Sequence, residues 1–85
     1  MALYWLVYRQ GKYRTVLIVE DPLLPGARLR ADVATPGLDD HFVEGHELDD
    51  ATAARIPATA IGRMMTLEQA AKIIGQIERA SKSER

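Results

Sequence analysis

Both histidines of the chain lie in a short acidic stretch whose residue types could bind a metal ion. The stretch contains Asp39, Asp40, His41, Glu44, His46 and Glu47. Imidazole nitrogens and carboxylate oxygens are ligands that Zn, Mn or Fe ions accept. The two histidines are five residues apart, however, which puts them on opposite faces of a strand and on no common face of a helix. The spacing favours a solvated acidic segment without a metal or cofactor, and we retain these six residues as candidate binding residues.

The charge of the chain is sorted along its length. Residues 31–54 hold seven acids and no lysine or arginine, whereas residues 1–30 carry five bases against two acids. Residues 55–85 carry six bases against three acids. The three segments therefore have net charges of +3, −7 and +3, which sum to the net charge of −1. Such sorting is typical of a surface that recognises a partner or pairs with another part of the same chain. We expect the acidic middle to form one exposed contact surface in front of a scaffold built by the basic ends.

Five basic residues form a second candidate binding set. They are Arg9, Lys12, Arg14, Arg28 and Arg30. Together with Tyr8 and Tyr13 they could hold single-stranded nucleic acid through phosphate contacts and base stacking. The isoelectric point of about 6.1 argues against this use, because affinity for nucleic acid depends mainly on positive charge. We favour the interpretation in which these bases pair with the acidic segment of the same chain or of a partner chain.

The sequence gives no indication of catalysis, and we expect that the protein is not an enzyme. It has no cysteine, and its only serines, Ser81 and Ser83, lie in the polar C-terminal stretch. No phosphate-binding or dinucleotide-binding glycine motif is present. The adjacent acids at 39–40 and 49–50 stand where turns and helix N-caps favour such residues. The lack of cysteine, together with the lack of an apolar stretch of membrane length, predicts a cytoplasmic protein.

The N-terminal third predicts an antiparallel β-hairpin. Leu3–Arg9 and Arg14–Glu20 are rich in aromatic, aliphatic and β-branched residues, and a short polar link with Gly11 separates them. The side chains at alternate positions, which point to opposite faces of a strand, are apolar in both sets. The hairpin therefore needs cover on both faces, from a second copy of the chain or from loops. Ala27–Ala34 alternates like a third strand, although its alanines also fit a short helix. Pro25 and Gly26 disfavour a helix that begins before Ala27.

The C-terminal half predicts two helices. Asp49 is a helix N-cap for a short helix that ends at Ile56, because Pro57 disfavours the α conformation in the residue before it. Thr66 and Gln69 form a capping box, and an apolar face recurs at helical spacing over 66–80. Between these helices and the hairpin, His41–Leu48 is compatible with a short irregular strand.

Three segments resemble the CcdB type of bacterial toxin. They are Tyr13-Arg14, the loop from Leu23 to Arg28, and the stretch from Ile56 to Gly62. The resemblance implies a small barrel-like fold with a C-terminal helix. In that family a Trp-Gly-Ile ending poisons DNA gyrase, whereas this chain ends Ser83-Glu84-Arg85 and has its only tryptophan at position 5. The resemblance therefore does not imply the toxin activity.

These patterns predict one α+β domain over residues 1–80, followed by a polar tail over 81–85. A small antiparallel sheet, made of the hairpin and a third strand, packs against the C-terminal amphipathic helix and one short helix. The function that fits best is a non-catalytic binding or regulatory module acting through protein–protein contacts, with a protein partner or as a homodimer. The alternative is a small nucleic-acid-associated or toxin-like protein that uses the basic residues of the hairpin. Neither a cofactor nor a membrane partner is expected.

Overall fold

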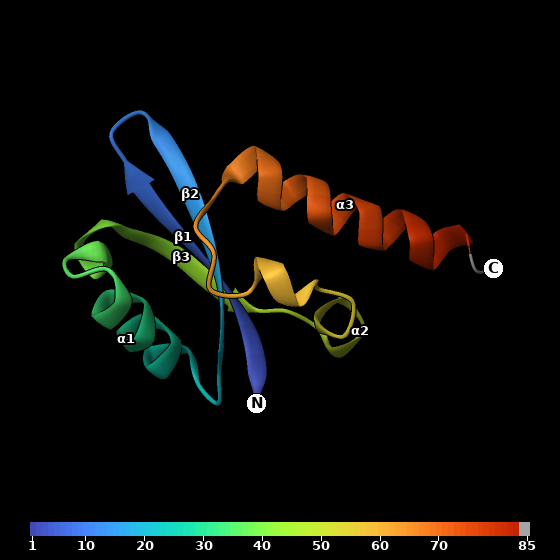
Figure 1. Ribbon diagram of the computed structural model, residues 1–85, viewed down its shortest axis with the longest axis horizontal. Coiled ribbons are helices and arrows are strands. Elements are labelled where there is room, and N and C mark those ends of the chain that lie inside the picture. The colour runs from blue at the N-terminus through green and yellow to red at the C-terminus, as the bar shows by residue number, and fades with distance from the viewer. Residues whose placement is uncertain (84–85) are drawn as a thin grey trace.

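The predicted hairpin forms the centre of an antiparallel sheet. In the computed structural model, which describes residues 1–83, β1 (Ala2–Gln10) pairs with β2 (Tyr13–Asp21) along its whole length. Gly11 lies in the turn with a φ of 64°, a conformation that favours glycine. β3 (Phe42–Glu47) pairs with the other side of β1, and β4 (Met65–Thr66) pairs with β2. The strand order is therefore β3-β1-β2-β4 (Figure 1).

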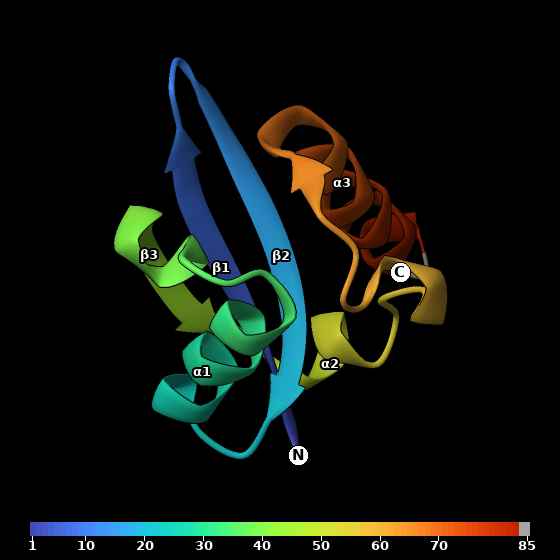
Figure 2. The same cartoon turned by 60° about the vertical axis from the view of Figure 1, so that its left-hand side comes forward.

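Helices cover both apolar faces of this sheet, as Figure 2 shows for α1 and α3. The side chains of Tyr4, Leu6 and Tyr8 form one face, here called the Tyr4 face, which packs against α1 (Leu24–Ala34) and the 3-10 turn η1 (Leu38–His41). The other face, here called the Trp5 face, packs against α2 (Asp50–Ala53), the 3-10 turn η2 (Ala58–Ala60) and α3 (Leu67–Ser83). Cover for the second face thus comes mainly from a helix, α1, and neither loops alone nor a second copy is needed for it.

The prediction that Ala27–Ala34 is a strand is wrong, because this segment lies within α1. Ala27 and Ala31, one helical turn apart, are buried against the Tyr4 face. The helix also begins before Ala27, at Leu24, because Pro25 stands in the first turn, where a backbone N–H has no helical acceptor. The third strand of the sheet is instead β3. It lies within His41–Leu48, the segment for which the sequence predicted a short irregular strand.

The two predicted C-terminal helices are present with different ends. The N-cap of α2 is confirmed, since Asp49 Oδ1 accepts the backbone N–H of Thr52 at 3.0 Å, but the helix ends at Ala53 rather than Ile56. The capping box of α3 is confirmed too: Thr66 Oγ1 accepts from the Gln69 backbone, and Gln69 Oε1 accepts from the Thr66 backbone, both at 3.1 Å. α3 continues to Ser83, into the predicted polar tail, and residues 84–85 lie outside the described residues.

The sheet is open, with β3 and β4 at its two edges, rather than closed into the barrel that the toxin resemblance implies. β4 is only two residues long, and the chain between η2 and β4 also contacts β2, because the Gly62 N–H donates to Ile18 O at 2.7 Å. Ile61 makes an isolated parallel bridge to Ile18 in the same segment. Within residues 1–83, no helix is long and apolar enough to cross a membrane.

Candidate partner-binding surface

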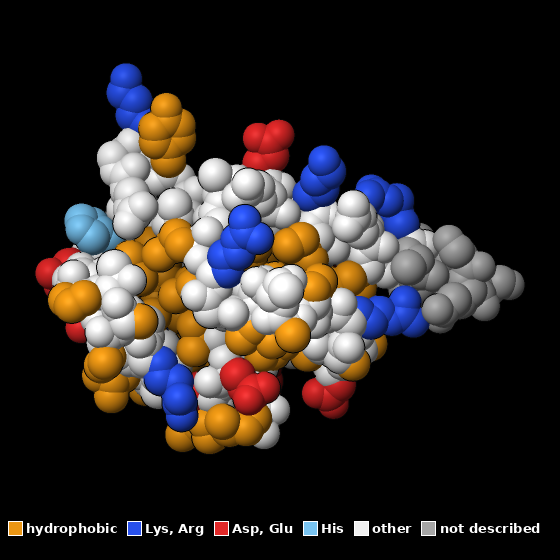
Figure 3. Space-filling model, viewed as in Figure 1, with side chains coloured by type: hydrophobic (Ala, Val, Ile, Leu, Met, Phe, Trp, Pro, Cys, Tyr) orange, Lys and Arg blue, Asp and Glu red, His pale blue; other side chains and the backbone are white. Residues whose placement is uncertain are grey.

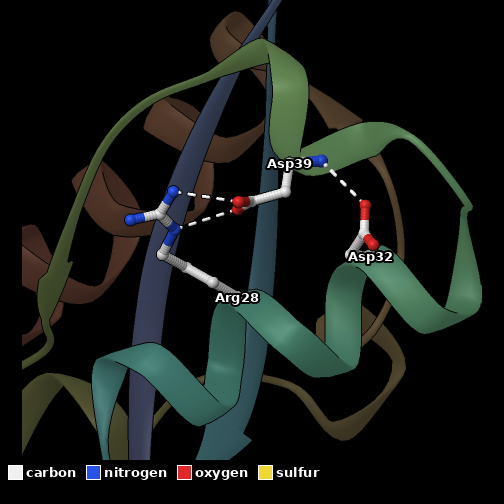
Figure 4. Close-up of polar contacts among 3 residues, drawn as sticks. All are labelled: Arg28, Asp32 and Asp39. Carbon is white, nitrogen blue, oxygen red and sulfur yellow. Dashed lines mark hydrogen bonds and ion pairs between the residues drawn. The ribbon is translucent and has the colours of Figure 1, made fainter.

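Arg28 and Asp39, one from each candidate set, form an ion pair between α1 and η1. Arg28 donates Nε–H to Asp39 Oδ1 at 2.9 Å and Nη2–H to Oδ2 at 3.0 Å (Figure 4). Its Cζ atom also lies 3.9 Å from the centre of the Phe42 ring. Asp32 extends the arrangement, because its Oδ1 accepts the backbone N–H of Asp39 at 3.1 Å. The expected pairing of a basic residue with the chain's own acidic segment is therefore confirmed for Arg28.

Tyr8 lies close to this ion pair and is fully buried. Its ring meets the Phe42 ring edge-on, with 5.9 Å between the ring centres. Burial, followed by the nearby Asp39 carboxylate, raises the pKa of Tyr8 to about 12, so the phenol stays neutral at physiological pH. Its hydroxyl makes no hydrogen bond to any described residue. This group therefore belongs to the core and offers no binding atom at the surface.

Arg30 also pairs within the chain, but with an acid outside residues 31–54. Its Nε–H donates to Asp21 Oδ1 at 2.5 Å, and Asp21 Oδ2 accepts the backbone N–H of Leu23 at 3.1 Å. The bond from Arg30, and then the one from Leu23, hold the pKa of Asp21 below its usual value. Arg30 and Asp21 therefore fix the entry into α1.

The other three basic candidates, Arg9, Lys12 and Arg14, are exposed at the tip of the β1–β2 hairpin. Arg9 stands directly opposite Arg14 in the sheet register. Arg9 also lines a hollow of about 370 Å³ with Asp40 and His41, which reach it from η1. The structure thus brings one base of the first strand beside two residues of the acidic segment, although their side chains lie at the solvent surface.

The remaining candidates lie on β3 and point to opposite faces of the sheet. His46 pairs with Trp5 and Glu44 with Val7, so both belong to the Trp5 face. Glu47 pairs with Tyr4 and belongs to the Tyr4 face. The His46 ring stacks on Trp5, with 6.3 Å between ring centres and 27° between planes. Strand alternation therefore separates acids that are close in sequence.

The prediction of one acidic contact surface is wrong. Asp39 binds Arg28, Asp49 caps α2, and the two glutamates of β3 point to opposite faces. Acidic side chains accordingly stand at separate places around the face shown in Figure 3. In the described part of the chain, no three His, Asp or Glu side chains lie close enough together to hold a metal ion.

A groove of about 320 Å³ runs between α3 and the part of the Trp5 face that α3 leaves uncovered. Its lining combines the strands and the helix: Trp5, His46 and Leu48 from one side, and Ala71, Ile74, Gly75 and Glu78 from the other. Most of these side chains are apolar, and an imidazole and a carboxylate are the polar groups. Such a lining, with few polar groups around an aromatic residue, is typical of surfaces that bind apolar side chains.

Of the residues in this groove, only His46 belongs to the candidate binding residues predicted from the sequence. The sequence left Trp5 as either a core residue or an interface anchor, with the core favoured. In the structure it is partly buried, packs against the core and reaches the groove. Gly75 was the available signal, because a glycine in the middle of an amphipathic helix reduces helix stability. A close neighbour does not explain it: a Cβ at Gly75 would meet only Arg79 Nη1, at an ordinary 3.6 Å. Because Gly75 has no side chain, it instead leaves space in the groove on the side formed by α3.

Comparisons with known proteins give no further guide to this surface. No family model matches the chain, and neither a curated protein nor a solved structure matches it.

Proposed function

We propose that this protein is a non-catalytic protein-binding module that holds an apolar segment of a partner protein in the groove between α3 and the Trp5 face. The observation that carries the proposal is the incomplete cover of that face. Ile74 of α3 and Trp5 of β1 both line the groove, and both are only partly buried. A small domain gains stability by burying such side chains, so the partial exposure of Ile74 beside an aromatic residue is typical of a binding surface.

The charges at the groove favour a partner segment that is also basic. Glu78 is part of the lining, and Glu44 lies on the same sheet face as His46, two residues away. A partner with an apolar anchor and a lysine or arginine beside it would place its cation near these carboxylates. Charges at the rim contribute little binding energy, but they select the partner and accelerate association.

Trp5 allows this proposal to be tested without a label, because it is the only tryptophan of the chain and lines the groove. Two amphipathic helical peptides of equal length, one of leucine and lysine and one of leucine and glutamate, serve as probes. We expect the leucine–lysine peptide to change the emission of Trp5 in a saturable way and to bind at least about tenfold more tightly than the leucine–glutamate peptide. No change with either peptide would refute the proposal.

Two α3 variants make the test specific to the groove. A71K adds a long cationic side chain to the groove lining at an exposed position. Q76K adds the same side chain at another exposed position of the helix, which lines a separate hollow with Met65 and Ile73. We expect A71K to weaken binding of the leucine–lysine peptide about tenfold and Q76K to leave it within about threefold of wild type. Equal weakening by both variants would show that the groove is not the binding site.

The second candidate function, nucleic-acid binding, is favoured by one observation at the hairpin tip. Tyr13 is 76 % exposed between the bases Lys12 and Arg14, where a nucleobase could stack on its ring. Fluorescence polarisation with a labelled single-stranded oligonucleotide at low and high salt tests it. Binding that falls steeply with salt and is lost in Y13A would support this function, and salt-independent or absent binding would refute it.

A further inference from the structure

The outer edge of β3 is a free sheet edge in the described part of the chain. β3 closes the strand order and pairs with β1 on its inner side only. Figure 2 shows β3 as the outermost strand on its side of the sheet. An unpaired edge presents backbone N–H and C=O groups that can pair with another strand.

The backbone register identifies which residues of β3 point these groups outward. The Leu48 N–H donates to Leu3 O at 2.9 Å, so Leu3 and Leu48 form a hydrogen-bonded pair across the strands. Such pairs alternate along an antiparallel ladder, which makes Trp5–His46 the next hydrogen-bonded pair. The backbone groups of His46 therefore point to β1, and those of Gly45 and Glu47 point to the free edge.

From this edge we infer that the protein forms a homodimer in which β3 pairs antiparallel with β3 of a second copy, centred on Gly45. Only registers that set one outward-pointing residue opposite another can form the ladder. A register centred on Glu44 would place two glutamates opposite each other, and one centred on His46 would place two imidazoles opposite each other. The register centred on Gly45 instead sets Glu44 opposite the partner's His46, twice by symmetry.

The complementarity of Glu44 and His46 is therefore the reason to commit to a second copy as the occupant of this edge, because an imidazole N–H donates a hydrogen bond to a carboxylate. Charged side chains on an edge strand usually oppose pairing with other chains. On β3, however, the acid and the imidazole stand two residues apart on the same face, so the strand is complementary to itself in one register. Because Glu44 and His46 occupy the positions between the outward hydrogen-bonded pairs, they meet their partners at the shorter strand separation. A hydrogen bond from the imidazole to the carboxylate stabilises the pairing at such positions, whereas like charges placed there destabilise it.

This inference does not require the groove to bind a partner, although His46 contributes to both surfaces. Its experiment is a charge exchange read by sedimentation equilibrium. We expect wild type to dimerise, H46E and E44K each to dissociate at least about tenfold more readily, and the double variant E44K/H46E to recover to within about threefold. E47K is the matched control on the same strand, because Glu47 lies on the Tyr4 face, away from Glu44 and His46, and this variant should dissociate within about threefold of wild type. A monomeric wild type at millimolar concentration, or a double variant weaker than both single variants, would overturn the proposal.

Disulfide formation tests the register without relying on charge. The chain contains no cysteine, so introduced thiols are its only ones. In the proposed register, an oxidised mixture of the E44C and H46C variants forms an intermolecular disulfide, since directly opposite residues of adjacent strands have suitable geometry. Such a mixed dimer keeps one of the two Glu44–His46 pairs intact. E44C alone and H46C alone should stay uncrosslinked. A covalent dimer from either variant alone, or none from the mixture, would contradict the register.

Discussion

The carboxylate of Asp21 occupies the space in which a Cβ atom on Gly26 would lie. Asp21 cannot easily move aside, because Arg30 and the Leu23 backbone hold its two oxygens. We therefore expect G26A to destabilise the fold by about 1–3 kcal/mol, since the added methyl forces a packed and hydrogen-bonded group to shift. Urea unfolding of both proteins measures the difference.

G75A and D21A/G26A are the controls for this prediction. A Cβ at Gly75 has ordinary room, so G75A should stabilise the protein by up to about 1 kcal/mol through helix propensity. In the D21A background the methyl has space, and G26A should then have much less effect than in wild type. An equal effect of G26A in both backgrounds would show that the contact with Asp21 is not the cause.

Stability should decline in acid through two carboxyl groups. Hydrogen bonds from Arg30 and Leu23 lower the pKa of Asp21, and hydrogen bonds from Thr52 lower that of Asp49. A lowered pKa in the folded state means that the unfolded state binds protons first as the pH falls. The contribution of each group is therefore complete above its unfolded pKa of about 4 and is lost as the pH falls through the lower folded value.

The melting temperature as a function of pH checks this prediction. D21N and D49N should each show a shallower fall below about pH 4 than wild type. R30M removes the main cause of the lowered pKa of Asp21, so it should resemble D21N in slope while retaining the carboxyl group. If none of the three variants changes how steeply the melting temperature falls in acid, Asp21 and Asp49 are not the groups responsible for that fall.

Replacing Tyr8 with phenylalanine should not destabilise the protein. The Tyr8 hydroxyl is buried without a hydrogen-bond partner among the described residues, which is unfavourable relative to its hydrated state when unfolded. We expect Y8F to gain about 1 kcal/mol in the free energy of unfolding. Y4F is the matched comparison, because the Tyr4 hydroxyl donates to Pro22 O at 3.4 Å and its removal should give a small loss. A loss in Y8F larger than in Y4F would refute the prediction.

The ion pair of Arg28 with Asp39 should contribute modestly to stability. Both side chains are close to two-fifths exposed, at 38 % and 39 %, so solvent weakens their attraction. A double-mutant cycle of R28A and D39A should give a coupling of about 0.5–1 kcal/mol. R28K should recover only part of the loss from R28A, because lysine has neither the planar fork nor the stacking on Phe42. A coupling near zero would show that the pair only accompanies the packing of α1 on η1.

The elements that could be predicted from sequence are those whose signals are local. The hairpin follows from its two runs of aromatic, aliphatic and β-branched residues and from Gly11 between them, and the start of α3 follows from the capping box of Thr66 and Gln69. α1 could not be predicted in the same way. Its buried side chains are small, and Gly26 is needed there because of the contact with Asp21, which a strand or helix propensity does not reveal.

The candidate site was harder to predict than the fold. A block of acids in sequence indicated one surface, yet alternation along β3 sends Glu44 and Glu47 to opposite faces. The groove joins residues of β1 to residues of α3 that are about seventy positions later. No local pattern could indicate that the helix leaves Trp5 partly uncovered, since that depends on where the helix crosses the sheet.

The position of His46 ties together the two surfaces proposed for this protein. Its ring lies on Trp5 in the wall of the groove, and its strand is the one that ends the sheet. On these two proposals, a change in the orientation of this imidazole alters both the groove and the edge of the sheet at β3. By thermodynamic reciprocity, whatever factor a groove ligand applies to self-association, self-association applies to the affinity for that ligand.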